Sequence, residues 1–469
     1  MSDDAAPLPE AHAPAAPPTA DAVPMPMPTP APPPPPRRGL HFELLASTIN
    51  TLRLWLWAAT AGAAAAVATL AFRWLTLQVE WLATGKTSGL VEAAQAIPPW
   101  QRVLVCAVGG LLAGAVLQWG ARWVLRGKQG DHYLDYIDAA RQGRVDLNDR
   151  ANAMRTLSAM LSIGTGASIG REGPMVQLAA WASAWLARIV PIAPEQRSAI
   201  MVCGIAAGIA AAYHAPVAGV VFVLELALGF FARHTVAPVL IASGTASALV
   251  YVMVDPKPLY ATAPIALLPS SIIFTVLASI LFGGLGWGFL LLVQRSRAEF
   301  SRIRSMALRL GLGGLLVGLL SAWVPEVWGN GYSVVVRALS GAETWQWLAL
   351  VLVTKVVATS WSSGSGAIGG MFTPSLFVGA AAGGVMAQLA ALWLPTAWVG
   401  DPRSLVVIGM AAVLTAATHA PLMAITMVLE MTNEFQLTVP VMLACAIAYA
   451  ISTQFGTKPL YGNPIEAVR

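Results

Sequence analysis

Long apolar runs separated by short polar stretches dominate the chain from about residue 55 onward. Most of these runs reach or exceed the roughly 20 residues that an α-helix needs to cross a bilayer. The pattern therefore predicts a mostly helical chain with many membrane-spanning segments. The long runs lie at about 55–79, 101–125, 199–228, 235–254, 265–293, 307–325 and 403–430.

A second group of apolar segments is too short, or too interrupted by glycine and proline, to predict a simple span. Non-helical backbone at membrane depth is tolerated only where protein covers it or where it lines a watery cavity. In transporters, broken helices of this kind surround the binding site. We therefore expect function in this second group, which comprises 155–163, 175–191, 345–360, 373–395 and 437–455.

The composition excludes a set of soluble domains. Charged residues make up 11% of the 469 residues, and the mean hydropathy is +0.66. Soluble domains carry about 25% charged residues, and a surface with much less charge would expose apolar area to water. The net charge of +5 comes largely from arginines beside the apolar runs, which is a membrane-topology pattern rather than a nucleic-acid surface. The three cysteines, Cys106, Cys203 and Cys445, have no disulfide or zinc-ligand spacing.

The N-terminal segment differs in composition from the rest. Residues 1–36 are rich in proline and alanine and contain no aromatic residue, so they cannot bury enough apolar surface to offset the entropy of ordering. We expect a disordered tail over residues 1–40, and the pattern does not match a signal peptide. Two spans separate the basic residues of 37–53 from those of 122–150. Both groups, and the tail with them, are therefore expected on the cytoplasmic side.

Two stretches of the chain carry the same landmarks. Residues 164–174 (GTGASIGREGP) have a counterpart 200 residues further on, at 364–374 (GSGAIGGMFTP). These landmarks predict an internal duplication with halves at about 101–260 and 305–460. Hydropathy leaves open whether the halves are parallel or inverted. The other landmarks pair at equal spacing: Gly204 with Gly409, His214 with His419, and Glu225 with Glu430.

The turn at residues 170–174 (GREGP) has the features of an anion site. Glycine permits a tight turn, and proline suits the first turn of the helix that follows. Peptide N–H groups at a helix start carry the positive end of the helix dipole. The related turn at 369–374 supplies a second set of N–H groups. If the repeat is inverted, both helix starts converge at the membrane midplane.

Glu172 places a carboxylate where an anion would bind. It can occupy the site and be displaced by a permeant anion, or it can take up a proton and swing away. Either route would make Glu172 a gate. The alternative is a structural ion pair with Arg171, which we consider weaker because adjacent residues at a helix start do not face each other.

The paired histidines and glutamates have structural interpretations. His214 and His419 permit a proton relay, but their symmetric positions before Ala-Pro favour a role in packing or in turns. Glu225 and Glu430 are expected to bind backbone N–H groups. An intramembrane hydrolase using His214 or Ser365 would lack a convincing nucleophile–base pair, so we expect no enzyme. A structural or receptor role would leave both anion-friendly helix starts unexplained.

Several motifs resemble the CLC chloride channel and transporter family. They are GREGP at 170–174, AAYHAPVAGVVFVLE at 211–225, SGSGAIGGMFTPSLFVG at 363–379, THAPLMAITMVLEMT at 418–432 and KPLY at 458–461. The sequence WGNGYS at 328–333 and the GSGAIGGMFTP form are most similar to the bacterial ClcB-like branch. The resemblance covers about residues 45–465 and implies one transmembrane domain over 41–465. It also implies an all-α inverted-repeat fold, a homodimer with one anion pathway per subunit, and a bacterial inner-membrane location.

The resemblance also implies roles for individual residues. Glu172 matches the gating glutamate, and Tyr461 matches the tyrosine whose hydroxyl binds the central ion. The family signature GSGIP is absent, and Gly130 and Asp131 stand at the position where it would start. The serine hydroxyl that favours chloride in the family is therefore missing. Asp131 would repel anions if it faced the pore. The amides expected to face the outer anion sites are those of Arg171, Glu172, Gly173, Met371, Phe372 and Thr373.

Proton coupling is the second departure from the family. Its exchangers carry an internal glutamate, and the matching position here is Leu226. The missing carboxylate favours a channel, or an exchanger whose protons move along water, over a standard coupled antiporter. We therefore expect a chloride channel or transporter of the voltage-gated type. A proton-coupled or fluoride-selective halide antiporter of the same fold is the alternative. No CBS domains are expected after Tyr461, and no metal or cofactor is expected beyond chloride as the permeant ligand.

Overall fold

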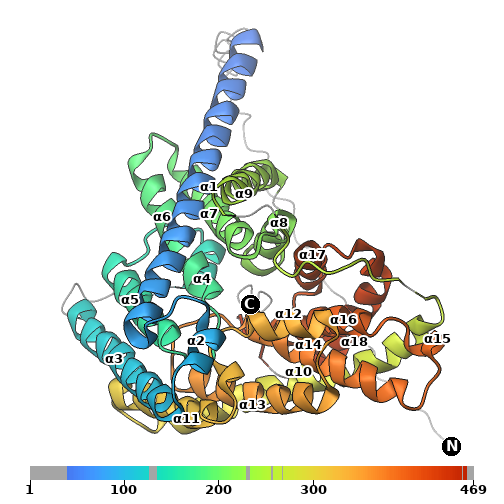
Figure 1. Cartoon of the computed structure of the whole chain (residues 1–469). Helices are drawn as coiled ribbons and strands as arrows, with labels where there is room; N and C mark the ends of the chain where they lie inside the picture. The colour runs from blue at the N-terminus through green and yellow to red at the C-terminus, as the bar shows by residue number, and fades with distance from the viewer. Residues whose placement is uncertain are drawn as a thin grey trace, which may run out of the picture. The chain divides into compact units, whose positions relative to one another are not determined.

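The computed structural model describes residues 40–125, 135–228, 233–254, 257–266, 268–456 and 458–461. Within these stretches the secondary structure is helical (Figure 1), and the β-type pairing is an isolated bridge between Gly170 and Gly370. The expected all-α fold is confirmed.

The helices follow the chain in two groups, coloured blue to green and yellow to red in Figure 1. The first group is α1 (Leu40–Thr84), α2 (Leu90–Ala96), α3 (Pro99–Leu125), α4 (Tyr136–Arg141), α5 (Asp149–Gly164), α6 (Glu172–Ile189), α7 (Pro194–Tyr213), α8 (Pro216–Phe222), a π-helical turn (Val223–Ala227) and α9 (Arg233–Met253). The second group is α10 (Ser271–Ser301), α11 (Met306–Ser321), a 3-10 turn (Pro325–Val327), α12 (Tyr332–Ser340), α13 (Trp345–Gly364), α14 (Phe372–Ala391), α15 (Thr396–Val399), α16 (Pro402–Thr418), α17 (Pro421–Thr432), a 3-10 turn (Phe435–Leu437) and α18 (Thr438–Gln454).

Nine helices in the described part of the chain are long and apolar enough to cross a membrane, which makes this a multi-pass membrane protein. Three segments that the sequence pattern marked as short or broken are among them. The runs at 345–360, 373–395 and 437–455 belong to uninterrupted candidate spans. The prediction was wrong there because their glycines and prolines lie at helix starts or at tight helix contacts, not at breaks.

Two runs predicted to be continuous are broken instead. The run at 199–228 divides after α7 at His214, and the run at 403–430 divides after α16 at His419. Both histidines adopt left-handed backbone, with φ of 55° and 56°. Each next helix begins at a proline two residues later, where the missing N–H costs nothing. The expected role of the histidines in turns is confirmed.

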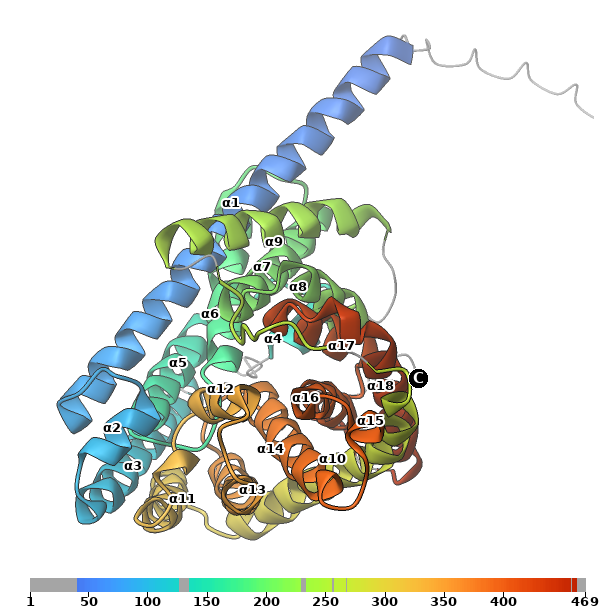
Figure 2. The ribbon, with the colours of Figure 1, turned by 45° about the vertical axis from the view of Figure 1, so that its right-hand side comes forward.

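The two halves exchange helix caps at α8 and α17, which lie side by side in Figure 2. Glu225 accepts hydrogen bonds from the N–H groups of Leu422 (3.1 Å) and Met423 (2.6 Å) at the start of α17. At the start of α8, Glu430 accepts them from Val217 (2.9 Å) and Ala218 (2.7 Å). The expected binding of backbone N–H groups is confirmed, and the acceptor in each case comes from the opposite half.

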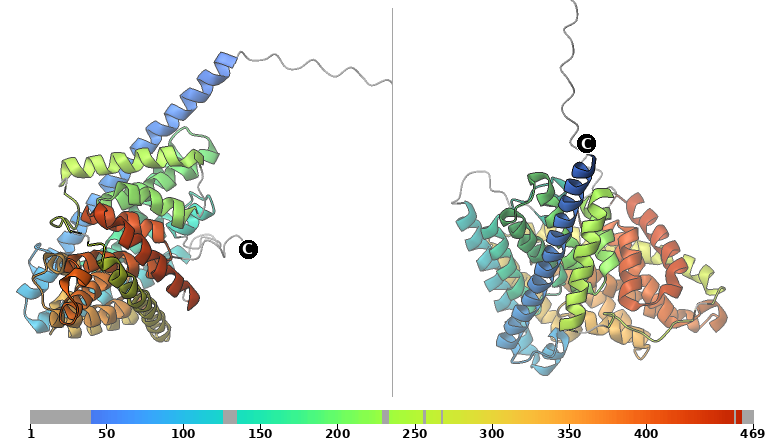
Figure 3. Two further views of the ribbon diagram at one scale, coloured as in Figure 1. Left: turned by 90° about the vertical axis from the view of Figure 1, so that its right-hand side faces the viewer. Right: turned by 90° about the horizontal axis from the view of Figure 1, so that it is seen from above.

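Glycines allow several pairs of helices to pack closely. A Cβ on Gly379 or Gly409 would overlap the other residue's carbonyl, so α14 and α16 touch backbone to backbone. Gly204 leaves room for the Ser183 side chain of α6 against α7. Small residues are the usual means of helix association in lipid, because apolar burial gives no advantage there. Gly62 likewise brings α1 against α9, the dark blue and light green helices of Figure 3.

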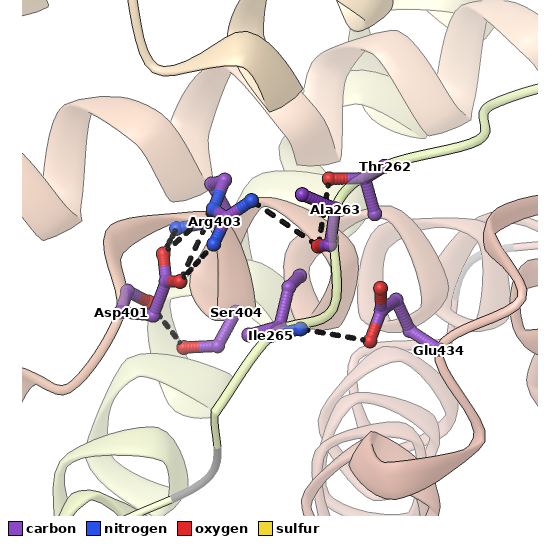
Figure 4. A network of polar contacts seen from close by, with 7 residues as sticks. All are labelled: Thr262, Ala263, Ile265, Asp401, Arg403, Ser404 and Glu434. Atoms are coloured by element: carbon purple, nitrogen blue, oxygen red, sulfur yellow. Dashed lines mark hydrogen bonds and ion pairs between the residues drawn. The ribbon is translucent and has the colours of Figure 1, made fainter.

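Polar contacts fix the segment between α9 and α10 to the second half (Figure 4). Arg403, paired with Asp401 at the start of α16, donates from Nη1 to the carbonyl of Ala263 at 3.2 Å. Glu434 accepts from the N–H of Ile265 at 3.2 Å. The connection between the halves is therefore held in place by charged hydrogen bonds and not by apolar packing alone.

Candidate functional site

The two related turns cross each other at Gly170 and Gly370. The N–H of Gly170 donates to the carbonyl of Gly370 (2.8 Å), and the N–H of Gly370 donates back to Gly170 (2.7 Å), in antiparallel pairing. A Cβ on Gly173 would lie 2.9 Å from the Cα of Gly370, and one on Gly370 would lie 2.8 Å from the N of Gly173. Only residues without a side chain fit this crossing, which we call the glycine crossing.

The helices α6 and α14 both begin at the glycine crossing. Arg171 and Met371 are their N-cap residues, and neither side chain caps its helix. The first N–H groups of a helix have no acceptor within it, and here they belong to Glu172 and Gly173 on α6 and to Phe372 and Thr373 on α14. The structure therefore brings together all six residues that were expected to offer amides.

The Glu172 carboxylate is buried at this crossing, with 4% of the residue exposed. Its Oε1 accepts a hydrogen bond of 2.6 Å from Nδ2 of Asn330. Its Oε2 is buried without a hydrogen-bond partner among the described residues. No ion pair in the described part of the chain joins Glu172 to Arg171. The structural ion-pair interpretation of Glu172 is therefore wrong.

Glu172 lines one of two cavities that meet the start of α6. A cavity of about 500 Å³, which we call the Arg171 cavity, is lined by Glu172 together with Arg73, Arg171 and Lys257. A smaller cavity of about 90 Å³, the Tyr461 cavity, is lined by Gly173, Gly369, Asp135 and Tyr461. Cationic side chains in a low-dielectric cavity attract anions. The adjacent residues 172 and 173 thus line different cavities.

Glycine backbone conformations and hydrogen bonds define the loop that carries Asn330. Gly329 and Gly331 on either side have φ of 64° and 87°, which favours glycine. The N–H of Tyr332 donates to Oδ1 of Asn330 at 3.1 Å, so the amide group of Asn330 is turned toward Glu172. Buried Lys355 of α13 donates to the carbonyls of Gly329 (2.7 Å) and Val327 (3.0 Å).

Sequence reasoning did not assign roles to Asn330 or Lys355. Asn330 lay within a motif that served only to indicate a family branch. Lys355 is a charged residue inside an apolar run, and such residues are costly in a membrane and usually functional. That signal was available at 345–360 and would have identified it.

Tyr461 lies against the start of α14. Its ring stacks on Phe372 at a centroid distance of 4.9 Å, and its hydroxyl lies at the amide of Met371. Burial raises the pKa of Tyr461, so it remains a neutral hydrogen-bond donor at physiological pH. Burial also raises the pKa of the nearby Asp135 carboxyl. Gly130 and Asp131, the residues expected in place of the GSGIP signature, lie outside the described residues.

The position expected for an internal proton carrier holds a buried aliphatic side chain. Leu226 is 2% exposed and lies in the π-helical turn after α8. Its carbonyl accepts a hydrogen bond of 2.8 Å from Nη2 of Arg141. Among the described residues no cluster of histidine, cysteine or carboxylate side chains has the make-up of a metal site.

Comparison with known proteins gives a consistent result. Residues 109–453 match the model of the voltage gated chloride channel family. The putative chloride channel protein ClcB-like of Ralstonia nicotianae is 44% identical over 87% of this chain and 95% of its own length. The voltage-gated ClC-type chloride channel ClcB of Citrobacter koseri is 37% identical over 86% of this chain and 97% of its own.

Solved structures share the fold at lower identity. A slow cyanobacterial Cl⁻/H⁺ antiporter superposes with a TM-score of 0.75 at 23% identity, covering 87% of this chain and 96% of that one. A CLC-type fluoride/proton antiporter gives 0.71 at 23% identity, covering 90% and 99%. With the crossed helix starts and these matches together, the chain belongs to the CLC family of chloride channels and transporters, in its ClcB-like branch.

Proposed function

We propose that the chain conducts chloride between the Arg171 cavity and the Tyr461 cavity, past Glu172, with one pathway in each subunit of a homodimer. The observation that carries this proposal is the buried Glu172 carboxylate, which lies at two helix starts without side-chain caps and lines the Arg171 cavity, while the next residue, Gly173, lines the Tyr461 cavity. The resemblance to the family supports the homodimer. The bacterial relatives and the arginine distribution support an inner-membrane location with the N-terminus in the cytoplasm.

The pathway stabilises an anion without a fixed counter-charge at its centre. Free N–H groups of α6 and α14 and the Tyr461 hydroxyl donate hydrogen bonds to it, while Arg73, Arg171 and Lys257 concentrate anions in the outer cavity. Partial charges hold an ion less tightly than an ammonium or guanidinium group would. An ion can therefore both enter and leave such a site.

Glu172 closes the pathway by occupying the anion position itself. Its negative carboxylate competes with chloride for the same donors. A neutral carboxyl is a weaker competitor, because hydrogen bonds to charged groups are stronger than those to neutral ones. Acid conditions and high chloride are both expected to displace it.

The missing internal carboxylate at Leu226 favours a channel over a coupled antiporter. Two of the structural neighbours support the antiporter alternative, since one is a Cl⁻/H⁺ antiporter and the other a fluoride/proton antiporter. Purified protein in liposomes, loaded with chloride and monitored for chloride efflux and for proton movement, distinguishes the two. Chloride efflux without stoichiometric proton uptake is expected. Proton uptake driven by a chloride gradient would establish the antiporter, and a strong preference for fluoride would exclude the chloride assignment.

Replacement of Asn330 tests how the gate is held. Asn330→Ala removes the hydrogen bond to Glu172, and a hydrogen bond to a charged group is worth about 1.5–3 kcal/mol. Chloride efflux at neutral pH is expected to rise by about tenfold, since 1.4 kcal/mol corresponds to a factor of ten.

A double variant and a control decide the interpretation of that result. Adding Asn330→Ala to Glu172→Gln is expected to produce no further rise, because both changes act on one contact. Ser333→Ala, in the wall of a neighbouring cavity, is expected to leave efflux unchanged. An Asn330→Ala variant with wild-type efflux would show that Asn330 does not hold the gate.

A further inference from the structure

The end of α7 carries a buried polar group that neither the fold nor the pathway described above uses. Tyr213 is the last residue of α7 and is 0% exposed. Its hydroxyl has no hydrogen-bond partner among the described residues. Buried hydroxyl groups without a partner are rare and costly, and they indicate a water or an ion that completes the site.

The surroundings of Tyr213 point to the anion pathway. Its ring meets Phe372 edge to face, with centroids 6.2 Å apart, and Phe372 stacks on Tyr461. The two tyrosines therefore flank the same phenylalanine at the start of α14. Tyr213 thus lies beside the start of α14, at the same phenylalanine as Tyr461.

A second hydroxyl without a partner lies beside it. Thr373, in the first turn of α14, is 1% exposed, and its Oγ1 has no hydrogen-bond partner among the described residues. The two hydroxyls are neighbours, but their contact does not meet hydrogen-bond geometry. Two buried hydroxyl donors without a partner thus lie at the helix start whose first N–H groups have no acceptor within the helix. An anion accepts from all of them.

We infer that the hydroxyls of Tyr213 and Thr373 are ligands of the permeating anion, forming a site between Glu172 and Tyr461. This inference rests on the proposed anion pathway and adds its specificity-determining side chains. The resemblance to the family expects a serine hydroxyl from the GSGIP signature, and this chain lacks it. Tyr213 and Thr373 supply hydroxyl donors from α7 and α14 in its place.

The test is chloride binding to the purified full-length protein in detergent, measured by titration calorimetry. Tyr213→Phe removes only the hydroxyl oxygen and is expected to weaken chloride binding by about tenfold, because the lost hydrogen bond is to a charged ion. Thr373→Val is expected to act in the same direction. Tyr449→Phe is the matched control: it makes the same chemical change on α18, where the side chain is 38% exposed and contacts His419.

Thermal unfolding provides a second readout that separates binding from folding. A ligand that binds the folded state raises the unfolding temperature, and at a fixed ligand concentration the rise is larger for tighter binding. Without chloride, Tyr213→Phe is expected to unfold at the wild-type temperature or above it, since a costly unpartnered hydroxyl is gone. With chloride, its unfolding temperature is expected to rise less than that of the wild type.

The outcomes distinguish this inference from the proposed chloride conduction on which it rests. If the wild type binds and conducts chloride while Tyr213→Phe binds it with unchanged affinity, the hydroxyl is satisfied by water and the inference is wrong, although the pathway stands. If the wild type neither binds nor conducts chloride, the proposed function fails and the inference fails with it. Weaker binding in Tyr213→Phe, with Tyr449→Phe unchanged, supports the inference.

Discussion

Chloride efflux through Glu172→Gln is expected to exceed that of the wild type by about tenfold at neutral pH and to lose its dependence on pH. Glutamine has the size of the protonated acid but cannot ionise, so it competes poorly with chloride for the amides of α6 and α14. A hydrogen bond to a charged acceptor is worth about 1.5–3 kcal/mol and one to a neutral acceptor about 0.5–1.5 kcal/mol. The difference of about 1 kcal/mol per bond, summed over two amides, corresponds to at least about a tenfold change in occupancy. Efflux from liposomes at pH values between about 4 and 8, spanning the usual carboxyl range, provides the measurement.

Glu92→Gln is the matched control for that experiment. Glu92 lines a cavity next to the Arg171 cavity but does not reach the glycine crossing. Its neutralisation is expected to leave the pH profile of efflux unchanged. A Glu172→Gln variant that keeps the wild-type pH profile would place the gate at another residue.

The Glu225→Ala and Glu430→Ala variants are expected to lose about 3 kcal/mol of stability each. Each of the two carboxylates accepts two backbone N–H hydrogen bonds at a helix start of the opposite half. A hydrogen bond to a charged group is worth about 1.5–3 kcal/mol, and water does not replace it at membrane depth. Chemical or thermal unfolding of the purified protein gives the measurement.

The symmetry of the duplication makes this prediction more specific. The two alanine variants are expected to be destabilised to a similar extent, because α8 and α17 are capped in the same way. Glu299→Ala, which removes an exposed ion pair with Arg302, is expected to have almost no effect. Wild-type stability in either capping variant would show that the exchanged caps do not hold the halves together.

The sequence predicted the parts of the site that depend on local chemistry. The glycines and proline at 170–174 and 369–374 encode tight turns and helix starts, and their repetition predicted that two such starts belong together. Glu172 was identifiable because it places a carboxylate where the N–H groups of a helix start would bind an anion, and its neighbour Arg171 does not face it. These features depend on residues near one another in the chain.

The parts that depend on tertiary contact were not predictable in the same way. Nothing in the spacing of Asn330 connects it to Glu172, which lies 158 residues away. Glu225 and Glu430 were expected to bind N–H groups, but the exchange between halves follows from the packing of α8 against α17. The His-Ala-Pro motifs indicated turns at His214 and His419, whereas hydropathy predicted continuous runs there, because apolar residues continue on both sides of each turn.

Anomalous diffraction from crystals grown in bromide locates the anion directly. Bromide replaces chloride chemically and scatters anomalously, so its position is independent of the refined protein. We expect a bromide peak within hydrogen-bond distance of the Phe372 and Thr373 amides and the Tyr461 hydroxyl, next to the glycine crossing. Bromide bound away from the starts of α6 and α14, in protein that conducts bromide in liposomes, would contradict it.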